Sequence, residues 1–348
     1  MEAARILAIE TSCDETACAV LENGRILLAS VVASQMDIHA RFGGVYPEVA
    51  SRQHILSVVP VVEQALAQAH LAVSDIDAVA ATRGPGLAGS LVVGLNFAKG
   101  LALGRGLPLV GVSHLEGHIY SAWVVQPEDP SPPPEPGFPL LALLVSGGHT
   151  ELALMEGHLA YRHLGATRDD AAGEAFDKVA RLLGLEYPGG PAVEKAAEKG
   201  DPQAFNLPRA WLNGTWDFSF SGLKTAVLQT VRKLEKDGTG VPVADLAAGF
   251  QAAVVEVLVT KAMTAAREYN VGEILVVGGV SANKALRQAF TQQDQFHANF
   301  PPISLCTDNA AMIAAAGYYR LINGHIDKLD IDVLPNWPLS RPTEKTTQ

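Results

Sequence analysis

Apolar and polar positions alternate along the first third of the chain in a strand, helix and turn pattern. Three short apolar segments are bounded by turn residues, and the pair Asn23-Gly24 between the last two is typical of a type I′ hairpin. The predicted strands are residues 5–10, 17–21 and 25–33. Helix and strand signals then alternate, with helices predicted at 55–69 and 90–103 and strands at 78–82 and 107–112. This pattern predicts an α/β fold.

The second half of the chain repeats this order. Strands are predicted at 140–145, 150–155, 159–164 and 274–277, and helices at 170–183, 245–269, 283–290 and 309–322. Two halves with the same order of elements, three strands and then helix, strand and helix, indicate a duplication. The arrangement resembles the outline of the actin, hexokinase and Hsp70 superfamily (ASKHA), in which two ribonuclease-H-like domains flank an interdomain cleft for nucleotide and metal.

Composition places the expected domain boundaries. Seven of the thirteen residues at 127–139 are proline, which favours stiff, extended chain and predicts a linker. We therefore expect an N-terminal actin-like domain at 1–126, completed by a C-terminal helix at about 309–330. The second actin-like domain is expected at 140–308, and a tail at 331–348.

Charge and cysteine content restrict the environment. The 348 residues include 26 basic and 37 acidic side chains, a net charge of −11, so no overall positive field attracts a nucleic acid. The first residues lack the basic stretch and apolar run of a secretory signal, and runs such as 87–103 are interrupted by polar residues. The three cysteines form no C-x-x-C pair. A soluble, cytoplasmic protein is expected.

Two histidines four residues apart, His114 and His118, would lie on one face of a helix and could bind a metal together. A surface position or an ordinary buried role is the alternative for this pair. Asp308 precedes an apolar helix and offers a third ligand, or it simply caps that helix. Two histidines and one carboxylate would leave coordination positions open, which suits iron(II) or zinc. The spacing differs from the H-E-x-x-H of zinc proteases.

Two glycine pairs follow predicted strands and allow close approach to a ligand. Gly147-Gly148 lies in a hairpin turn and Gly278-Gly279 opens a helix, where the backbone N–H groups favour an anion. As plain turns, either pair could be structural. The acidic pair Asp169-Asp170 is most simply read as a solvated helix start. No G-x-x-x-x-G-K-[ST] sequence occurs, which excludes a P-loop nucleotide site by motif.

Taken together, a series of ordered stretches closely resembles the universal tRNA adenosine threonylcarbamoyltransferases, known in bacteria as TsaD and formerly described as O-sialoglycoprotein endopeptidases. The match extends through nearly the whole chain, and its order makes it specific. The stretches lie at 9–16, 43–52, 84–87, 114–118, 145–150, 169–177, 187–191, 218–224, 278–283 and 306–309.

This resemblance implies the site residues and the reaction. The implied metal ligands are His114, His118 and Asp308, with iron(II) as the first expectation and zinc as the second. The resemblance implies transfer of a threonylcarbamoyl group from threonylcarbamoyl-AMP to adenosine 37 of tRNAs that read codons beginning with adenine, releasing AMP. No catalytic base is assigned, because the adenylate is already activated. The implied adenylate-binding residues are Leu144, Val145, Ser146, Gly147, Gly148, Asp177, Gly190, Glu194 and Asn283.

The implied partners are tRNA, a smaller paralogous actin-like subunit and a P-loop ATPase. Partner subunits could complete the basic surface that a chain with net charge −11 lacks. Arg41, Arg52 and Arg83 are candidate tRNA contacts from their loop positions, with solvated surface arginine as the alternative for each.

Three other functions fit parts of the pattern. An actin-like ATPase or small-molecule kinase would share the fold and would not need the histidine pair. A non-enzymatic scaffold would tolerate loss of His114, whereas a metalloendopeptidase would cleave a glycoprotein in a chelator-sensitive way.

Overall fold

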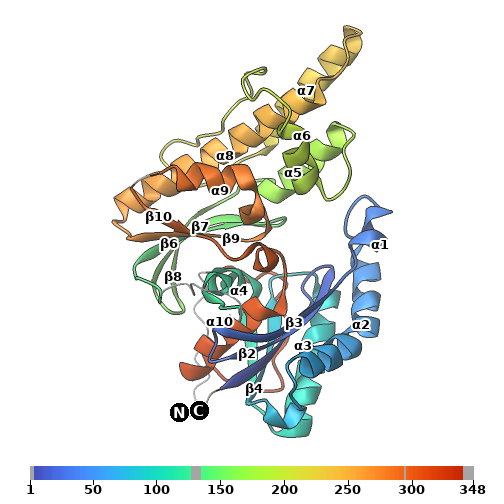
Figure 1. Ribbon diagram of the computed structural model, residues 1–348, viewed down its shortest axis with the longest axis vertical. Helices are drawn as coiled ribbons and strands as arrows, with labels where there is room; N and C mark the ends of the chain where they lie inside the picture. Colours follow the sequence, from blue (N-terminus) through green and yellow to red (C-terminus); the bar gives the residue numbers. More distant parts are fainter. Residues whose placement is uncertain (1–3, 127–134, 294, 340–348) are drawn as a thin grey trace. The chain divides into compact units, whose positions relative to one another are not determined.

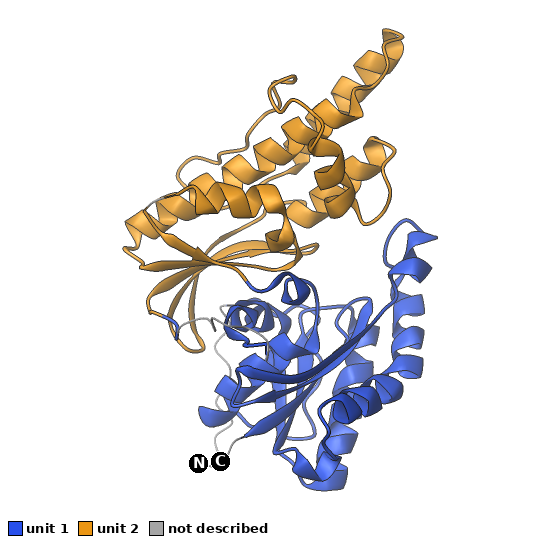
Figure 2. Cartoon of the chain, viewed as in Figure 1, with its two compact units in different colours: residues 1–136, 301–348 blue, residues 137–300 orange. Residues whose placement is uncertain are grey.

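The chain forms two compact units, which Figure 2 distinguishes by colour. The computed structural model describes residues 4–126, 135–293 and 295–339. Unit 1 comprises residues 1–136 and 301–348, and unit 2 comprises residues 137–300. The expected second domain, 140–308, therefore extends beyond unit 2. The chain returns to unit 1 after residue 300 because helix α10 (Ala310–Ile322) packs against the first sheet, and Asp308 lies in unit 1.

Unit 1 is built on a five-stranded sheet of order β3-β2-β1-β4-β5. Strands β1, β2 and β3 are antiparallel neighbours, whereas β4 and β5 run parallel to β1. Residues 6–9 of β1 are apolar and almost completely buried, as expected for a central strand covered on both faces. The strands are β1 (Arg5–Glu10), β2 (Glu15–Glu22), β3 (Ile26–Ser34), β4 (Ala78–Gly84) and β5 (Leu109–Ser113).

Helices cover both faces of this sheet (Figure 1). Helices α2 and α3 contact β2, β3 and β4, and their buried side chains form one apolar core with the sheet. Helix α10 contacts β1, β2 and β5 and packs against α4. The helices of unit 1 are α1 (Met36–Ala40), α2 (Pro47–Gln68), α3 (Ala88–Arg105), α4 (His114–Tyr120) and α10; short 3₁₀ turns lie at η1 (Val73–Asp75), η2 (Ser121–Trp123) and η4 (Ile303–Leu305).

Unit 2 repeats the topology of unit 1. Its sheet has the order β10-β9-β6-β7-β8, with an antiparallel meander of three strands and two parallel strands beyond its first. The strands are β6 (Leu140–Val145), β7 (Thr150–Gly157), β8 (Ala160–Ala166), β9 (Glu273–Val277) and β10 (His297–Asn299). The helices are α5 (Ala172–Leu182), α6 (Gly189–Ala197), α7 (Ser221–Lys236), α8 (Val243–Glu268) and α9 (Lys284–Thr291), with the 3₁₀ turn η3 (Gly279–Ala282).

Helix α8 is the central helix of unit 2. It is the one described helix that is long and apolar enough to meet the criteria for a membrane span, and 61% of its most apolar window is buried. Its buried side chains join those of α5, α6 and α7 in a single apolar core. Its composition is therefore accounted for by packing within unit 2.

The predicted α/β fold of actin-like halves is confirmed, and most predicted elements lie within a few residues of the observed ones. The hairpin at Asn23-Gly24 is also confirmed, with φ of 54° and 70°, although Arg25 lengthens the loop to three residues. Helix α2 begins at Pro47 rather than at 55, because proline fits the first turn of a helix. Helices α1, α6 and α7 and strand β10 were not predicted.

The segment after α10 packs against the rest of unit 1. Leu334 N–H donates to the carbonyl of Arg83, and Gly86 N–H donates to that of Pro335. The guanidinium of Arg83 lies over the buried ring of Trp337 and donates to the carbonyl of Asp332, so this arginine is held within unit 1. The described part of the expected tail, residues 331–339, is thus part of unit 1. Most of the predicted proline-rich linker, residues 127–134, lies outside the described residues.

Candidate functional site

A buried helix immediately after β5 brings the two predicted histidines together. Strand β5 ends at Ser113 and α4 begins at His114, and every residue of α4 is buried. The helical rise places His118 one turn beyond His114 on the same face. Helix α4 is fixed to α10 by a buried ion pair, in which Glu116 Oε2 accepts from Arg320 Nε over 2.7 Å. The conditional prediction of a helix at this pair is confirmed.

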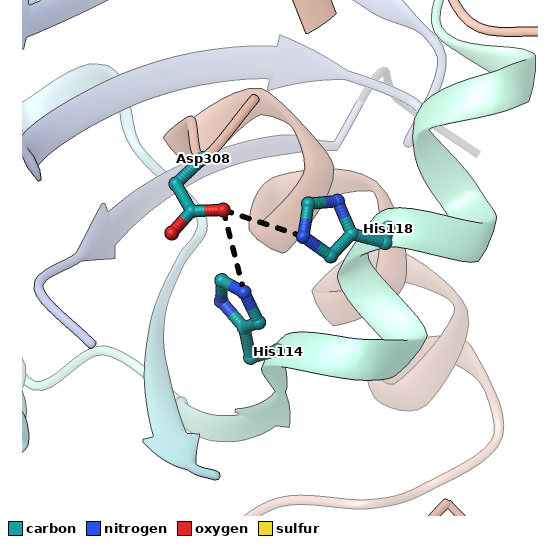
Figure 3. A group of neighbouring side chains, drawn as sticks. All are labelled: His114, His118 and Asp308. Carbon is teal, nitrogen blue, oxygen red and sulfur yellow. Dashed lines mark ion pairs between the residues drawn. The ribbon is translucent and has the colours of Figure 1, made fainter. Parts of the chain in front are cut away.

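Asp308 completes a three-residue cluster with these histidines (Figure 3). Its Oδ1 lies 3.4 Å from His114 Nε2 and 3.3 Å from His118 Nε2. The alternative that Asp308 caps α10 is wrong, because Asn309 is the N-cap residue and accepts from Met312 N–H over 3.0 Å. Since Asn309 satisfies the helix, the carboxylate of Asp308 is available to the histidines.

Glu10 holds His114 from the other side. This carboxylate lies at the end of β1 and is fully buried, with Oε2 3.1 Å from His114 Nδ1. Ser12 Oγ is also 3.1 Å from that nitrogen. Thr82 Oγ1 donates to Glu10 Oε2 over 2.5 Å, and Ser12 N–H donates to Oε1. A carboxylate on the second imidazole nitrogen is the common arrangement behind metal-binding histidines.

The electrostatics of the cluster favour one shared proton or cation. Burial disfavours charge on His114, but the carboxylates of Asp308 and Glu10 outweigh it and raise its pKa well above the usual value. Burial and the neighbouring His114 charge lower the pKa of His118, despite the opposing effect of Asp308. Burial opposes charge on Asp308 too, yet His114 and His118 hold the pKa of this carboxyl far below its usual value.

The donor set fits a divalent metal. The three ligand atoms lie within 4.8 Å of one another, and metal bonds of about 2.0–2.2 Å place ligand atoms roughly 3–4 Å apart. Both ring nitrogens of His118 are buried; among the described residues neither makes a hydrogen bond of normal geometry, and Nε2 has only the 3.3 Å contact with Asp308 Oδ1. A buried nitrogen without a partner is costly, and a metal would satisfy it. Two histidines and one carboxylate suit iron(II) or zinc with open positions.

A separate pocket of about 360 Å³ lies within unit 2. Parts of the β6–β7 turn, α5, α6 and the start of α9 surround it. Five of the expected substrate residues line it: Gly147, Asp177, Gly190, Glu194 and Asn283. The other expected residues, Leu144, Val145, Ser146 and Gly148, do not line this pocket; the first two are buried in β6.

Asn283 is the most connected polar residue of the pocket. Its Oδ1 accepts from Leu286 N–H and caps α9, while Nδ2 donates to Glu194 Oε2 over 3.1 Å and to Gln251 Oε1 over 2.9 Å. Burial raises the pKa of Glu194, although Lys284 opposes this. Gln251 was not predicted; its signal in the sequence is one polar residue on the apolar face of α8.

A glycine permits the close packing behind the pocket. Gly278 has φ of 92°, and a Cβ there would lie 2.5 Å from the carbonyl oxygen of Val145. Only glycine adopts this conformation readily at such a contact. Gly278 is therefore required for the packing of β9 against β6. The expected close approach of a ligand to the Gly278-Gly279 pair is left to Gly279, which lines the pocket.

The acidic pair Asp169-Asp170 is more than a solvated helix start, because Asp170 is buried although Asp169 is exposed. Asp169 Oδ1 accepts from the N–H groups of Phe220 and Ser221 and so holds the beginning of α7. Asp170 contacts Lys178 Nζ and Lys224 Nζ, each at 2.6 Å. Burial opposes charge on Asp170, but the two lysines lower its pKa overall. The pair therefore joins α5 to α7.

Comparison with protein families gives one family across most of the chain. The model of the family described as tRNA N6-adenosine threonylcarbamoyltransferase, TsaD, matches residues 26–315. A protein of that name from Thermomicrobium roseum is 55% identical over 96% of this chain and 96% of its own length. Another from Dehalococcoides mccartyi is 55% identical over 95% of this chain and 98% of its own length.

Solved structures with low sequence identity share the fold. Full-length HypF, in a phosphate- and nucleotide-bound form, has a TM-score of 0.60 and 12% identity, over 92% of this chain and 47% of its own. Component A of the Acidaminococcus fermentans (R)-2-hydroxyglutaryl-CoA dehydratase has a TM-score of 0.51 and 16% identity, over 91% of this chain and 96% of its own. At these identities the likeness concerns the fold alone.

Proposed function

Because the chain belongs to the tRNA N6-adenosine threonylcarbamoyltransferase family, we propose that it transfers a threonylcarbamoyl group from threonylcarbamoyl-AMP to the exocyclic amine of adenosine 37. The acceptors are tRNAs that read codons beginning with adenine, and AMP is released. The bond between the carbamoyl carbon and the AMP phosphate oxygen breaks as the new bond to the amine nitrogen forms. The amine loses one proton.

The observation that carries this proposal is the near-complete match to named relatives, 55% identity over 96% of the chain. The match includes the part of the chain with the histidine pair and extends to 315, so the Asp308 segment is covered as well. The match favours the transferase over the kinase, scaffold and endopeptidase alternatives, because the matched family and relatives are named as transferases.

We propose that His114, His118 and Asp308 bind one divalent ion, iron(II) first and zinc second. A bound ion would supply Lewis acidity toward an oxygen of the substrate. Glu10 and Ser12 would keep the Nε2 lone pair of His114 directed at the ion, because both lie 3.1 Å from Nδ1. Asp308 would neutralise part of the ion's charge.

We propose the unit 2 pocket as the binding site of the adenylate. Its volume of about 360 Å³ falls within the range of about 300–1,000 Å³ usual for small-molecule sites. Asn283 and Glu194 would orient the nucleoside by hydrogen bonds, and Asp177 would accept from a ribose hydroxyl. Gly147 and Gly190 leave the backbone open to the ligand. Leu144 and Val145 would act through the backbone at the end of β6, and Ser146 and Gly148 through that of the β6–β7 turn.

We propose that the partners are tRNA, a smaller paralogous actin-like subunit and a P-loop ATPase, in the cytoplasm. Helix α2 exposes Ile55, Leu56 and Val59 at 62%, 69% and 48%, an apolar face suited to a protein partner. A net charge of −11 also favours a partner that contributes basic surface for the tRNA.

Reaction of the chain and its partners with threonylcarbamoyl-AMP and unmodified tRNA tests the proposal. We expect equal amounts of AMP and N6-threonylcarbamoyladenosine, measured by chromatography and nucleoside mass spectrometry. Formation of AMP without the modified nucleoside would point to hydrolysis instead. Phosphorylation of a small molecule with ATP, in the absence of any modified nucleoside, would favour the kinase alternative.

A further inference from the structure

Buried polar groups connect the exposed loop between α1 and α2 with the loop that follows β1. The connection passes through the side chains of His39, Gln35 and His54, all of which are at most 2% exposed. It begins at the backbone of Tyr46 and ends at the backbone of Cys13. A fully satisfied buried network of this kind fixes the segments that it joins.

Four hydrogen bonds form this relay. Tyr46 N–H lies 3.2 Å from His39 Nδ1, and His39 Nε2 lies 3.1 Å from Gln35 Oε1. Gln35 Nε2 lies 3.3 Å from His54 Nδ1. His54 Nε2 lies 3.0 Å from the carbonyl oxygen of Cys13.

The two backbone groups at its ends decide where each proton lies. A main-chain N–H only donates, so Nδ1 of His39 accepts from Tyr46 and the imidazole proton is on Nε2. That proton is donated to Gln35 Oε1, which leaves the amide nitrogen of Gln35 facing His54. The Nδ1 of His54 therefore accepts, and its Nε2–H donates to the carbonyl of Cys13. Both imidazoles are neutral Nε2–H tautomers.

A second donor supports this assignment at His54. Thr16 Oγ1 lies 2.8 Å from His54 Nδ1 and can donate to it. Burial lowers the pKa of His54, against the hydrogen bond to Cys13 and the charges of Glu10 and Asp14. A neutral ring is thus favoured at this position.

The inner end of the relay lies beside the metal cluster. Cys13 follows Ser12, whose Oγ lies 3.1 Å from His114 Nδ1 and whose N–H donates to Glu10. The same loop is held again at Asp14, whose carbonyl accepts from Gln35 N–H over 3.0 Å. Fixing the carbonyl of Cys13 therefore fixes the orientation of the contact to His114.

The outer end lies in a loop that is open to solvent. Phe42 and Tyr46 are 58% and 48% exposed, and their ring centroids are 5.6 Å apart. The N–H that starts the relay belongs to Tyr46 itself. Phe42 and Gly44 N–H also donate to the main-chain carbonyl of His39, whereas Tyr46 N–H is the described loop group that donates to its imidazole. A change in this loop would therefore reach the buried ring of His39 through the Tyr46 N–H.

We propose that His39, Gln35 and His54 are positioning residues that hold the 11–14 loop against His114 and couple its geometry to the exposed 41–46 loop. The effect on transfer rests on the proposed function. The proton positions and the effect on metal affinity do not.

Imidazole nitrogen NMR of protein labelled with ¹⁵N-histidine tests the proton positions, with His39→Gln and His54→Gln used to assign the signals. We expect both rings to be neutral with the proton on Nε2. An Nδ1–H tautomer or a protonated ring at either position at neutral pH would overturn the relay.

A pair of substitutions at Tyr46 tests the coupling. Tyr46→Pro removes the donating N–H without altering a buried side chain, whereas Tyr46→Ala removes the exposed ring and keeps the N–H. We expect Zn²⁺ affinity, measured against a chromophoric chelator, to fall roughly fivefold in Tyr46→Pro, the equivalent of one neutral hydrogen bond. Tyr46→Ala should match the wild type. Equal affinities in both variants would contradict the coupling.

Substitutions at His54 test the inner end. His54→Ala should weaken Zn²⁺ binding by about tenfold, the lower end of the range for direct partners of metal ligands, because His54 acts on His114 through Cys13 and Ser12. His54→Gln, which keeps a donor and an acceptor, should recover most of the loss. Val58→Ala, one turn along α2 and also buried, is the control for general destabilisation. If Val58→Ala weakened binding as much as His54→Ala, positioning would be refuted.

The transfer assay separates the two proposals. We expect kcat to fall in His54→Ala in parallel with metal affinity, while the KM for threonylcarbamoyl-AMP stays within twofold. A wild type that has the expected tautomers and metal affinities, but forms no modified nucleoside, would remove the proposed function and leave the relay intact.

Discussion

Replacement of Glu10 by glutamine tests how the metal cluster is held. Glu10 is fully buried, and its two oxygens accept from Ser12 N–H and Thr82 Oγ1 while Oε2 faces His114 Nδ1. A glutamine fits the same space, but its NH₂ group must face either Ser12 N–H, which cannot accept, or His114 Nδ1, which would then have to accept. The charge that fixes the tautomer of His114 is lost as well. Both effects turn the imidazole away from its metal-binding orientation.

We expect Glu10→Gln to weaken Zn²⁺ binding by about 10–100-fold, the usual cost of losing a group that orients a ligand. That range corresponds to about 1.4–2.8 kcal/mol of binding free energy. Chelator competition measures the affinity, and urea unfolding shows whether the variant is folded at the assay temperature.

Glu116→Gln is the matched control. Glu116 is also a buried carboxylate, lies on the same helix as the two histidines and pairs with Arg320 rather than with a ligand. It should lose stability and keep its metal affinity. Wild-type affinity in a folded Glu10→Gln, or equal losses in both variants, would refute the role assigned to Glu10.

Further predictions concern protons, the pocket and its packing. Because the pKa of His114 is raised in the folded chain, its stabilisation is complete below pH about 6.5 and is lost as pH rises through the folded pKa. Urea unfolding of chelator-treated protein against pH measures this. Zn²⁺ must displace that proton, so Kd should fall about tenfold per pH unit while His114 remains protonated. Asn283→Ala should lower the unfolding free energy by about 1 kcal/mol through loss of the α9 cap. It should also raise the KM for threonylcarbamoyl-AMP, and an unchanged KM would show that Asn283 is not part of the substrate site. Gly278→Ala should lower the denaturation midpoint clearly more than Gly279→Ala, because only the first forces a Cβ against Val145.

Much of the fold was predictable because its pattern is local. The period-2 strands, the apolar run of β6 and the turn at Asn23-Gly24 are each determined by residues close in sequence. Helix α7 was missed because the contact that stabilises its start is not local. The start of α7 is stabilised by Asp169, 51 residues before Phe220, and no local pattern reports such a contact.

The residues of the site also fall into those with a local signal in the sequence and those that depend on distant contacts. The His114 and His118 spacing is a local signal. Asp308 was a candidate from its place before an apolar helix, and the family resemblance favoured it as a ligand over a helix cap. Glu10 lies in the resembling stretch 9–16, but no role was assigned to it, because its contact with Thr82 spans 72 residues. Thr82 and Gln251 were not predicted; the only trace of either is a polar residue in an apolar segment. The interpretation of Asp169-Asp170 as only a solvated helix start missed their contacts, because Phe220 and Lys224 are 51 and 54 residues away in the sequence.

The most direct test of the metal cluster and the transfer reaction is nucleoside mass spectrometry of unmodified tRNA. The tRNA is incubated with threonylcarbamoyl-AMP, the partner subunits and one of four forms of the chain. These are the wild type, His114→Ala, Asp308→Ala and the control Glu116→Gln. We expect N6-threonylcarbamoyladenosine with the wild type and the control, and at least a hundredfold less with the other two. Modification that survives both His114→Ala and Asp308→Ala would contradict the role of the cluster. No modified nucleoside from a folded, metal-loaded wild type with all partners present would contradict the transferase itself.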